Sequence, residues 1–146
     1  MIRRNTPRSR NPRAGVTLIE MLVVVVIIAV FAAVVGPRLL QQGDKARVVA
    51  AKQQIENFQL ALGQYHLDTG AYPTTEQGLQ ALRVQPNGAE QWHGPYLQKD
   101  VANDPWGHAY AYKFPGEHGD EPDIVSYGAD GQPGGTDLNA DIESWK

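Results

Sequence analysis

The sequence predicts an α+β fold in which one long N-terminal α-helix packs on a small antiparallel β-sheet. An apolar run near the N-terminus is followed at once by apolar residues at helical spacing, whereas the C-terminal half contains short alternating segments separated by Gly and Pro. Because neither a helix stripe nor a sheet face is buried alone, each is expected to cover the other. The predicted divisions are a basic leader at 1–15, a transmembrane helix at 16–36, an amphipathic continuation at 37–70 and a loop-rich β domain at 71–146.

The leader and the apolar run together predict a single membrane span. Residues 1–15 contain five arginines and no acid, whereas residues 16–35 are almost wholly apolar. About 20 such residues are enough to cross a hydrocarbon core of roughly 30 Å. Arginines on the N-terminal side predict that this end stays in the cytoplasm and that the C-terminal domain is exported.

The composition excludes several classes of function. Beyond the leader the chain carries 8 basic and 16 acidic residues, a net charge of −8, so a broadly basic nucleic-acid binder is not expected. Cysteine is absent, which excludes a disulfide, a thiolate metal site and a cysteine nucleophile. The four histidines lack zinc or hydrolase spacing, and no phosphate-binding glycine loop follows a strand. We therefore expect no enzyme.

Glu20 is the only ionisable residue in the apolar run. An acid near the centre of a membrane span costs ~3 kcal/mol, so it needs an explanation. Either its side chain reaches the nearby interface, or a cation from another subunit pairs with it. The run itself also allows an ordinary secretory signal, with Ala32, Ala33 and Gly36 near the cleavage site, or a plain uncleaved signal anchor.

Helical periodicity continues beyond the apolar run. Gly36-Pro37 could end the helix or loosen it, but a new apolar stripe begins shortly afterwards, which favours continuation. The stripe consists of residues alternately three and four apart, namely Val48, Ala51, Ile55, Phe58, Leu62 and Tyr65. Gly70 is a stop signal, so the sequence predicts a helix from Val16 to about Thr69.

The remaining chain predicts short elements joined by turns. Thr75-Glu76 with Leu79 and Leu82 indicates a brief helix, and residues 104–107 read as a turn. Alternation over residues 110–114 predicts a half-buried strand, followed by a second strand at 123–127 and a last one at 142–145.

Residues 127–141 form a candidate calcium loop. They combine carboxylates and an Asn with four glycines, and Ca²⁺ prefers about 6–8 oxygen ligands drawn from carboxylates and backbone carbonyls. Glycine allows the backbone to wrap so that carbonyls converge. The spacing is not that of an EF-hand, and the same residue types also make ordinary solvated turns, so the residues alone leave both interpretations open.

The N-terminal segment from Arg13 to Glu20 resembles a class III prepilin signal, in which a basic leader ends in Gly before an apolar helix with Glu at its fifth position. The resemblance implies cleavage by a prepilin peptidase between Gly15 and Val16, followed by N-methylation of Val16. It also implies that Glu20 offsets the N-terminal amine of a neighbouring subunit during assembly. The family usually has Phe where this chain has Val16.

The rest of the chain resembles the type II secretion major pseudopilin, or general secretion pathway protein G, family. The matching segments, in order, are Tyr72-Pro73-Thr74, Gln77-Gly78-Leu79, Asp104-Pro105-Trp106-Gly107, Gly128-Ala129-Asp130-Gly131 and Ala140-Asp141-Ile142 with Trp145. The resemblance implies a type IV pilin-like fold in which the long helix carries the small sheet. It further implies calcium bound in the 127–141 loop, with side-chain ligands Asp130 and Asp137, carbonyl ligands from Tyr127, Gln132 and Gly135, and Asn139 and Asp141 as further candidates.

The resemblance also implies a function. The chain would be the core structural subunit of the periplasmic pseudopilus of a Gram-negative bacterium, a helical homo-oligomer that drives folded exoproteins through the outer membrane. It would be a single-pass inner-membrane protein with a periplasmic C-terminal domain. Its expected partners are further copies of itself, minor pseudopilins, the inner-membrane assembly platform with its ATPase, the prepilin peptidase, the outer-membrane secretin and the secreted exoproteins.

Two alternatives to this function stay open from the sequence. The chain could be the subunit of a surface type IV pilus, although type IV pilins commonly close their C-terminal region with a disulfide that this chain cannot form. It could instead be a signal-anchored calcium-binding module or hydrolase in the periplasm. Loss of assembly and secretion on mutation of Glu20 would separate a filament subunit from such a module.

Overall fold

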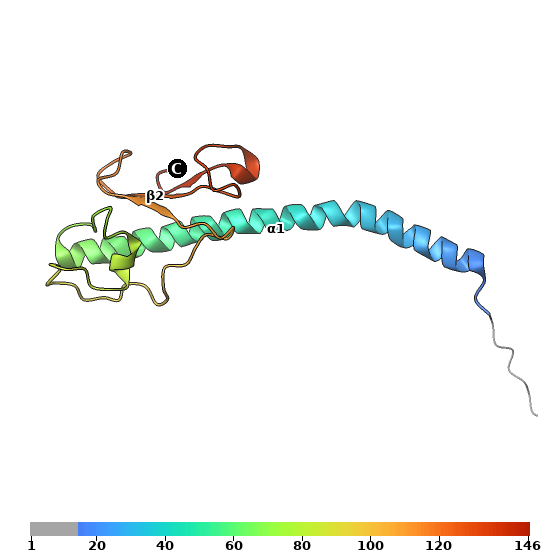
Figure 1. The fold of residues 1–146 in the computed structure, drawn as a ribbon, viewed down its shortest axis with the longest axis horizontal. Helices are drawn as coiled ribbons and strands as arrows, with labels where there is room; N and C mark the ends of the chain where they lie inside the picture. Colours follow the sequence, from blue (N-terminus) through green and yellow to red (C-terminus); the bar gives the residue numbers. More distant parts are fainter. Residues whose placement is uncertain (1–14) are drawn as a thin grey trace, which may run out of the picture. The chain divides into compact units, whose positions relative to one another are not determined.

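The computed structural model describes the backbone of residues 15–146 and the side chains of residues 15–35 and 42–146. The chain divides into two compact units, one ending at Leu40 and one covering Gln41–Lys146. Helix α1, Leu18–Thr69, contributes to both (Figure 1). It continues through Gly36-Pro37, so the prediction of a helix that continues past the proline is confirmed. The leader arginines lie outside the described residues.

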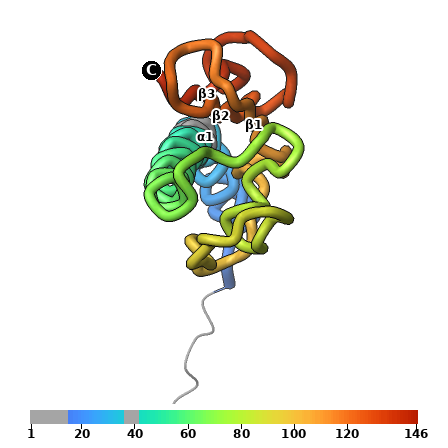
Figure 2. Tube along the Cα trace, turned by 90° about the vertical axis from the view of Figure 1, so that its left-hand side faces the viewer, coloured from blue at the N-terminus to red at the C-terminus, as the bar shows by residue number. Residues whose placement is uncertain are grey.

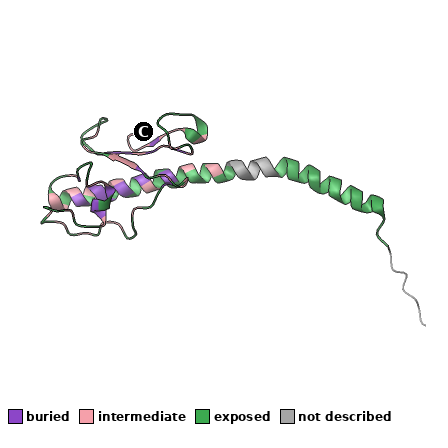
Figure 3. Ribbon diagram, in the orientation of Figure 1, coloured by how far each residue is buried: buried purple, intermediate pink, exposed green. Residues whose placement is uncertain are grey.

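The C-terminal part of α1 is helical because it buries the predicted apolar stripe. Ala51, Ile55, Phe58, Leu62 and Tyr65 are all at most 4% exposed, and Figure 3 shows buried residues on this part of the helix. The helix ends at Thr69 because Gly70 takes a left-handed conformation with φ 79° while its N–H still bonds to the His66 carbonyl at 2.8 Å.

Three short strands form the antiparallel sheet. They are β1 (Ala111–Lys113), β2 (Asp123–Ser126) and β3 (Ile142–Glu143), in the order β1-β2-β3. Ala111 faces Val125, which in turn faces Glu143. In the C-terminal unit the sheet lies over one side of α1, as Figures 1 and 2 agree. The fold class predicted from the sequence is therefore confirmed, with each strand slightly shorter than expected.

The buried residues of this unit form one hydrophobic cluster between helix, sheet and the segment after the helix. The aliphatic and aromatic side chains of α1 pack with residues that follow it, namely Leu79, Ala81, Leu82, Tyr110, Ile124 and Ile142. Phe58 is fully buried, and its ring meets that of Tyr110 edge to face at 5.2 Å between centroids. Val48, the first residue of the predicted stripe, is only partly buried.

The brief helix predicted near residue 75 is a four-residue 3₁₀-helix, η1, at Leu79–Leu82. The turn leading into it is closed by a reciprocal pair, because the Thr74 N–H bonds to Gln77 Oε1 at 2.9 Å and the Gln77 N–H bonds to Thr74 Oγ1 at 3.3 Å. Thr75 has another role, since its hydroxyl donates to the Phe114 carbonyl and accepts from the Phe114 N–H, both at 3.0 Å. This contact ties the segment to the end of β1.

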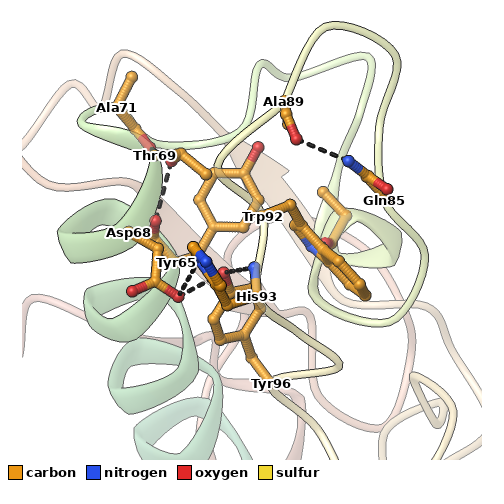
Figure 4. Close-up of polar contacts among 10 residues, drawn as sticks. Tyr65, Asp68, Thr69, Ala71, Gln85, Ala89, Trp92, His93 and Tyr96 are labelled. Carbon is orange, nitrogen blue, oxygen red and sulfur yellow. Dashed lines mark hydrogen bonds and ion pairs between the residues drawn. The ribbon is translucent and has the colours of Figure 1, made fainter.

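The segment after η1 is fastened to α1 by a polar cluster (Figure 4). The Tyr96 hydroxyl donates to Asp68 Oδ2 at 2.7 Å and accepts from the His93 N–H at 3.0 Å. Trp92 donates its indole N–H to the Ala81 carbonyl at 2.9 Å and meets the Tyr96 ring edge to face. Aromatic burial and satisfied hydroxyls therefore replace the regular secondary structure that this segment lacks.

Two tyrosines of the C-terminal unit, Tyr110 and Tyr112, have raised pKa values. Burial, and secondarily the Asp104 carboxylate, raises the pKa of Tyr110 to about 12. Burial also raises the pKa of Tyr112, whose hydroxyl donates to the Pro73 carbonyl at 2.8 Å. A raised pKa means that the fold favours the protonated form. This contribution to stability is therefore complete below the ordinary tyrosine pKa of about 10 and is lost as the pH rises through the folded value.

We expect the free energy of unfolding to fall steeply above about pH 10, and Tyr110→Phe to move the alkaline unfolding midpoint upward. Urea titrations at several pH values, together with tyrosinate absorbance, would measure both. At pH 7 the two proteins serve as the control for any direct packing effect of the substitution. Unfolding midpoints that do not differ between wild type and variant at high pH would contradict the expectation.

Candidate functional site

The N-terminal end of α1 is capped by Thr17. Its Oγ1 accepts a hydrogen bond from the Glu20 N–H at 3.3 Å, and its carbonyl accepts from the Met21 N–H at 3.2 Å. Thr17 and Glu20 therefore occupy the N-cap and third helical positions, and an acid in the first turn is favoured by the unpaired N–H groups there. The side chain of Glu20 is exposed. The sequence pattern alone could have identified this cap, because Thr-x-x-Glu is its signature.

The helix beyond Glu20 is apolar on every side. Leu18–Val35 has a mean hydropathy of 3.2 and no buried residue, which makes it long and apolar enough to cross a membrane. Phe31, Val25 and Ile28 each expose more than 60% of their surface. Exposed apolar surface of this extent needs a cover of lipid or of other protein.

A buried carboxylate organises the turn that precedes β1. The side chain of Asp104 is fully buried, and its Oδ1 accepts from the N–H groups of Trp106 at 3.1 Å and His108 at 2.8 Å. Its Oδ2 accepts from the buried Ser126 hydroxyl at 2.6 Å. The predicted turn at 104–107 is thus a hydrogen-bonded link between the loop and β2.

His108 connects the turn at 104–107 to the glycine-rich loop at 127–141. Its Nδ1 lies 3.1 Å from the Gly128 carbonyl oxygen, so the tautomer protonated at Nδ1 donates there. Gly131 sits against the imidazole, since a Cβ at that position would lie 3.0 Å from the ring. The start of the loop therefore packs on a turn that is held in place by hydrogen bonds to Asp104.

Within the loop, the backbone folds back on itself. The Ala129 N–H bonds to the Leu138 carbonyl at 2.9 Å, and the Gly134 N–H bonds to Asp141 Oδ2 at 2.9 Å. A Cβ on Gly135 would lie 2.5 Å from the Asn139 carbonyl oxygen, so only glycine allows this approach. A short 3₁₀-helix, η2 (Asp137–Asn139), closes the turn.

The predicted calcium ligands fall into two groups. Asp130, Gln132, Gly135, Asp137 and Asn139 are exposed, whereas Tyr127 and Asp141 are half-buried. Asp130 Oδ1 accepts from the Gln132 N–H at 3.1 Å. Within the residues that the structure describes, no three His, Asp or Glu side chains are gathered closely enough to hold a metal, so an ion here would depend largely on carbonyl oxygens.

Two features of the loop nevertheless fit a bound cation. Asp137 takes a left-handed conformation with φ 54°, which costs a non-glycine residue about 1–2 kcal/mol. Asp141 Oδ1 is buried and has no hydrogen-bond partner among the described residues. A strained acid and an unpaired buried carboxylate oxygen in one loop are both consistent with a cation ligand set.

Comparison with known proteins identifies the family. The model of the family described as type II secretion system (T2SS), protein G, matches residues 38–145, well over half of the chain. The chain belongs to this family. A second model, the prokaryotic N-terminal methylation motif, matches residues 10–36. The two matches agree with the two segments on which the resemblance in the sequence was based.

Relatives of this pseudopilin match over almost its whole length. The type II secretion system core protein G of Pseudomonas aeruginosa is 45% identical over 139 residues, covering 93% of this chain and 97% of that protein. The core protein G of Xanthomonas campestris pv. campestris is 39% identical over 145 residues, covering 98% and 99%. The crystal structure of the major pseudopilin from enterohaemorrhagic Escherichia coli has a TM-score of 0.59 and 35% identity, covering 75% of this chain and 95% of that one. Of the three interpretations of the sequence, these matches support the major pseudopilin.

The buried Asp104–Ser126 pair was missed in the sequence, where residues 104–107 were interpreted only as a turn. Nothing local distinguishes Asp104 from an exposed turn aspartate, because its hydrogen-bond partner Ser126 lies 22 residues away. The contact of His108 with Gly128 and Gly131 was not predicted from the sequence, for the same reason. The Asp104–Ser126 hydrogen bond and the His108 contacts both help to hold the candidate calcium loop in place.

Proposed function

We propose that this pseudopilin, as the major subunit of the type II secretion pseudopilus, assembles through the apolar part of α1. The observation that carries the proposal is the Leu18–Val35 span, which has no buried residue and a single acid at its start. In the membrane the span is covered by lipid, and in a filament it is covered by the same span of neighbouring copies. The span can therefore move from the membrane into the filament without exposing its apolar surface to water.

Glu20 is proposed to set the position of each copy along the filament. Cleavage after Gly15 would leave the amine of Val16 only one helical turn before Glu20, so each copy would present one cation and one anion at the same level. An intramembrane carboxylate is tolerated chiefly when it is paired, and the amine of an adjacent copy is the cation that every subunit brings. The hydrogen bond from the Glu20 N–H to Thr17 Oγ1 supports the helix start that places the two groups.

The remaining features follow from this role. Membrane anchoring agrees with the span and with the family, and we place the anchor in the inner membrane with the C-terminal domain in the periplasm, as the arginine-rich leader predicts. The proposed partners are the prepilin peptidase, the minor pseudopilins, the assembly platform with its ATPase, the secretin and the exoproteins. The growing filament would push these exoproteins through the outer membrane.

Glu20→Gln in the full chain is expected to abolish filament formation and secretion, because the amine of the neighbour loses its counter-charge. Glu56→Gln, which removes an exposed carboxylate from the same helix beyond the span, is the matched control and should assemble normally. Filaments are counted by electron microscopy, and mass spectrometry of the mature protein tests for a methylated Val16. Normal secretion by Glu20→Gln would overturn the assembly role, and a mature chain beginning at Met1 would overturn the processing.

We further propose that the 127–141 loop binds calcium. Asp130 and Asp137 would supply carboxylates, Tyr127, Gln132 and Gly135 would supply carbonyls, and Asn139 and Asp141 complete the candidate set. The ion would supply a cross-link between the two ends of the loop. The support is the strained backbone of Asp137 and the unpaired Asp141 Oδ1.

Asp130→Ala and Asp137→Gly are expected to separate a ligand role from a backbone role. In the wild type, added Ca²⁺ should raise the melting temperature and a chelator should lower it, since a ligand that binds only the folded state stabilises it. Both variants should lose this response. Asp137→Gly should also be slightly more stable than wild type in chelator, because glycine relieves the left-handed strain. A wild-type melting temperature that does not respond to chelator would exclude the site.

A further inference from the structure

The C-terminal unit exposes two uncharged surfaces that its own fold leaves uncovered. Among the described side chains of residues 42–146, only four large apolar ones are strongly exposed, namely Val49, Leu60, Leu67 and Val84. The first three are 11 and 7 residues apart, close to three and two helical turns, so they lie on one face of α1. Val84 follows η1 and belongs to a separate part of the surface.

The first surface, here the helix surface, consists of these three α1 residues and the groove beside Leu60. The groove has a volume of about 440 Å³ and lies between α1 and residues 96–102. Its walls are a mixture of apolar and amide side chains, and its only charged residues are Lys99 and Asp100. Asp100 already pairs with Arg83 at 3.2 Å, which leaves Lys99 as the one uncompensated charge of the groove.

The second surface, here the η1 surface, surrounds Val84. It is a shallow hollow of about 330 Å³ with no charged residue, lined by Gln77, Gln80, Gln85, Pro86 and Asn87 beside the valine. Val84 itself is 68% exposed. A lack of charged residues is characteristic of the core of protein–protein interfaces.

We propose that the helix surface of one copy packs against the η1 surface of the next copy. This inference rests on the proposed function and extends it from the membrane span to the globular domain. Each copy beyond the leader carries a net charge of −8, so acidic surfaces of two copies repel each other when they meet. The groove beside the sheet is lined by four acids, Glu117, Asp123, Asp141 and Glu143, against Lys113 and His118, so it keeps a negative charge and is a poor contact between acidic copies. The helix and η1 surfaces carry little or no net charge and can be desolvated with a smaller penalty.

The proposed contact is also of the kind that a filament requires. Pairing a surface with itself gives a closed dimer, but pairing two different surfaces leaves one of each free at the ends and lets the chain of subunits grow. The two surfaces share no lining residue. They are joined through Arg83, whose Nη1 donates to the Leu97 carbonyl at 2.8 Å, so the groove wall is held to the end of η1. In each subunit the Arg83 side chain therefore connects the surface that contacts one neighbour to the surface that contacts the next.

Engineered cysteines in the full chain test the contact, because the natural chain contains none. A chain carrying both Leu60→Cys and Val84→Cys is expected to give a ladder of disulfide-linked multimers when assembled filaments are oxidised. Each single variant should stay monomeric, and a mixture of the two single variants should stop at dimers. Leu60→Cys combined with Asp120→Cys, an exposed position in the loop between β1 and β2, is the matched control and should give no ladder.

Dimers formed by Leu60→Cys alone would show a helix-to-helix contact and overturn the proposal. So would filaments of the double variant that give no ladder. As a second measurement, Leu60→Ser and Val84→Ser should each lower the sedimentable filament fraction several-fold without changing the melting temperature. Asp120→Ser, at an exposed loop position, should leave the filament fraction unchanged. Unchanged assembly by both Leu60→Ser and Val84→Ser would also overturn the proposal. If the wild-type chain forms no filament at all, the proposed function itself fails, and that outcome is distinct from filaments that lack this contact.

Discussion

Asp104→Ala is expected to lower the free energy of unfolding of the 41–146 unit by about 3–5 kcal/mol. The substitution removes the acceptor of three hydrogen bonds and leaves the Ser126 hydroxyl and the N–H groups of Trp106 and His108 without their partner. A domain of this size has a total stability of roughly 5–15 kcal/mol, so much of the variant would be unfolded at physiological temperature. The contact between the 127–141 loop and His108 would also be lost, because Asp104 holds the turn that contains His108.

Urea denaturation followed by tryptophan fluorescence measures this loss. Asp104→Asn keeps an acceptor for the two N–H groups and should be less damaging. Asp100→Ala is the matched control, because that side chain is 93% exposed and its ion pair with Arg83 is a surface pair worth little. A loss below about 1 kcal/mol for Asp104→Ala would show that water replaces the carboxylate and that the network is not a structural centre.

Phe58→Ala should cost a similar amount, about 3–5 kcal/mol, through a different mechanism. The ring is fully buried at the centre of the cluster and packs edge to face on Tyr110, so truncation leaves a cavity between α1 and the segment before the sheet. Leu67→Ala on the same helix is the control. Its side chain is 83% exposed, and we expect a change within about 0.5 kcal/mol.

Both variants would be measured by urea denaturation of the 41–146 unit, which avoids the contribution of the membrane span. Equal losses for Phe58→Ala and Leu67→Ala would contradict the burial pattern of α1. If Leu67→Ala leaves stability unchanged but weakens filament assembly in the full chain, it adds support to the helix surface as a contact between copies.

The Asp104→Ala and Phe58→Ala substitutions affect the stability of the whole C-terminal unit. The predictions for pH, calcium and Glu20 instead concern one condition, one ligand or the contact with a neighbouring copy. Alkali acts on the hydroxyls of buried tyrosines such as Tyr110, calcium on one loop, and Glu20 only on the assembled state. A variant that loses secretion can therefore be assigned to folding, to the loop or to assembly by combining a melting curve with a filament count.

Much of the fold was predictable because it depends on local periodicity. The apolar span and the stripe from Ala51 to Tyr65 follow from residue spacing along a single helix, and the alternation at 110–114 follows from the pleat of a strand. Gly70 was identified as the stop because only glycine readily takes the left-handed conformation that ends this helix. The glycine-rich loop was recognised from composition, although its ligand set rests on resemblance to the family.

The sequence by itself determined the membrane span, the helix, the approximate strands and the family, since each is encoded in neighbouring residues. Only the tertiary structure decided that Asp104 is buried against Ser126, that His108 supports the loop and that Thr75 bonds to Phe114 rather than starting a helix. It also decided which apolar residues stay uncovered, including Leu60 and Val84. Burial depends on what the rest of the chain brings to a residue, and those contacts join residues too far apart in sequence for any local pattern to record them.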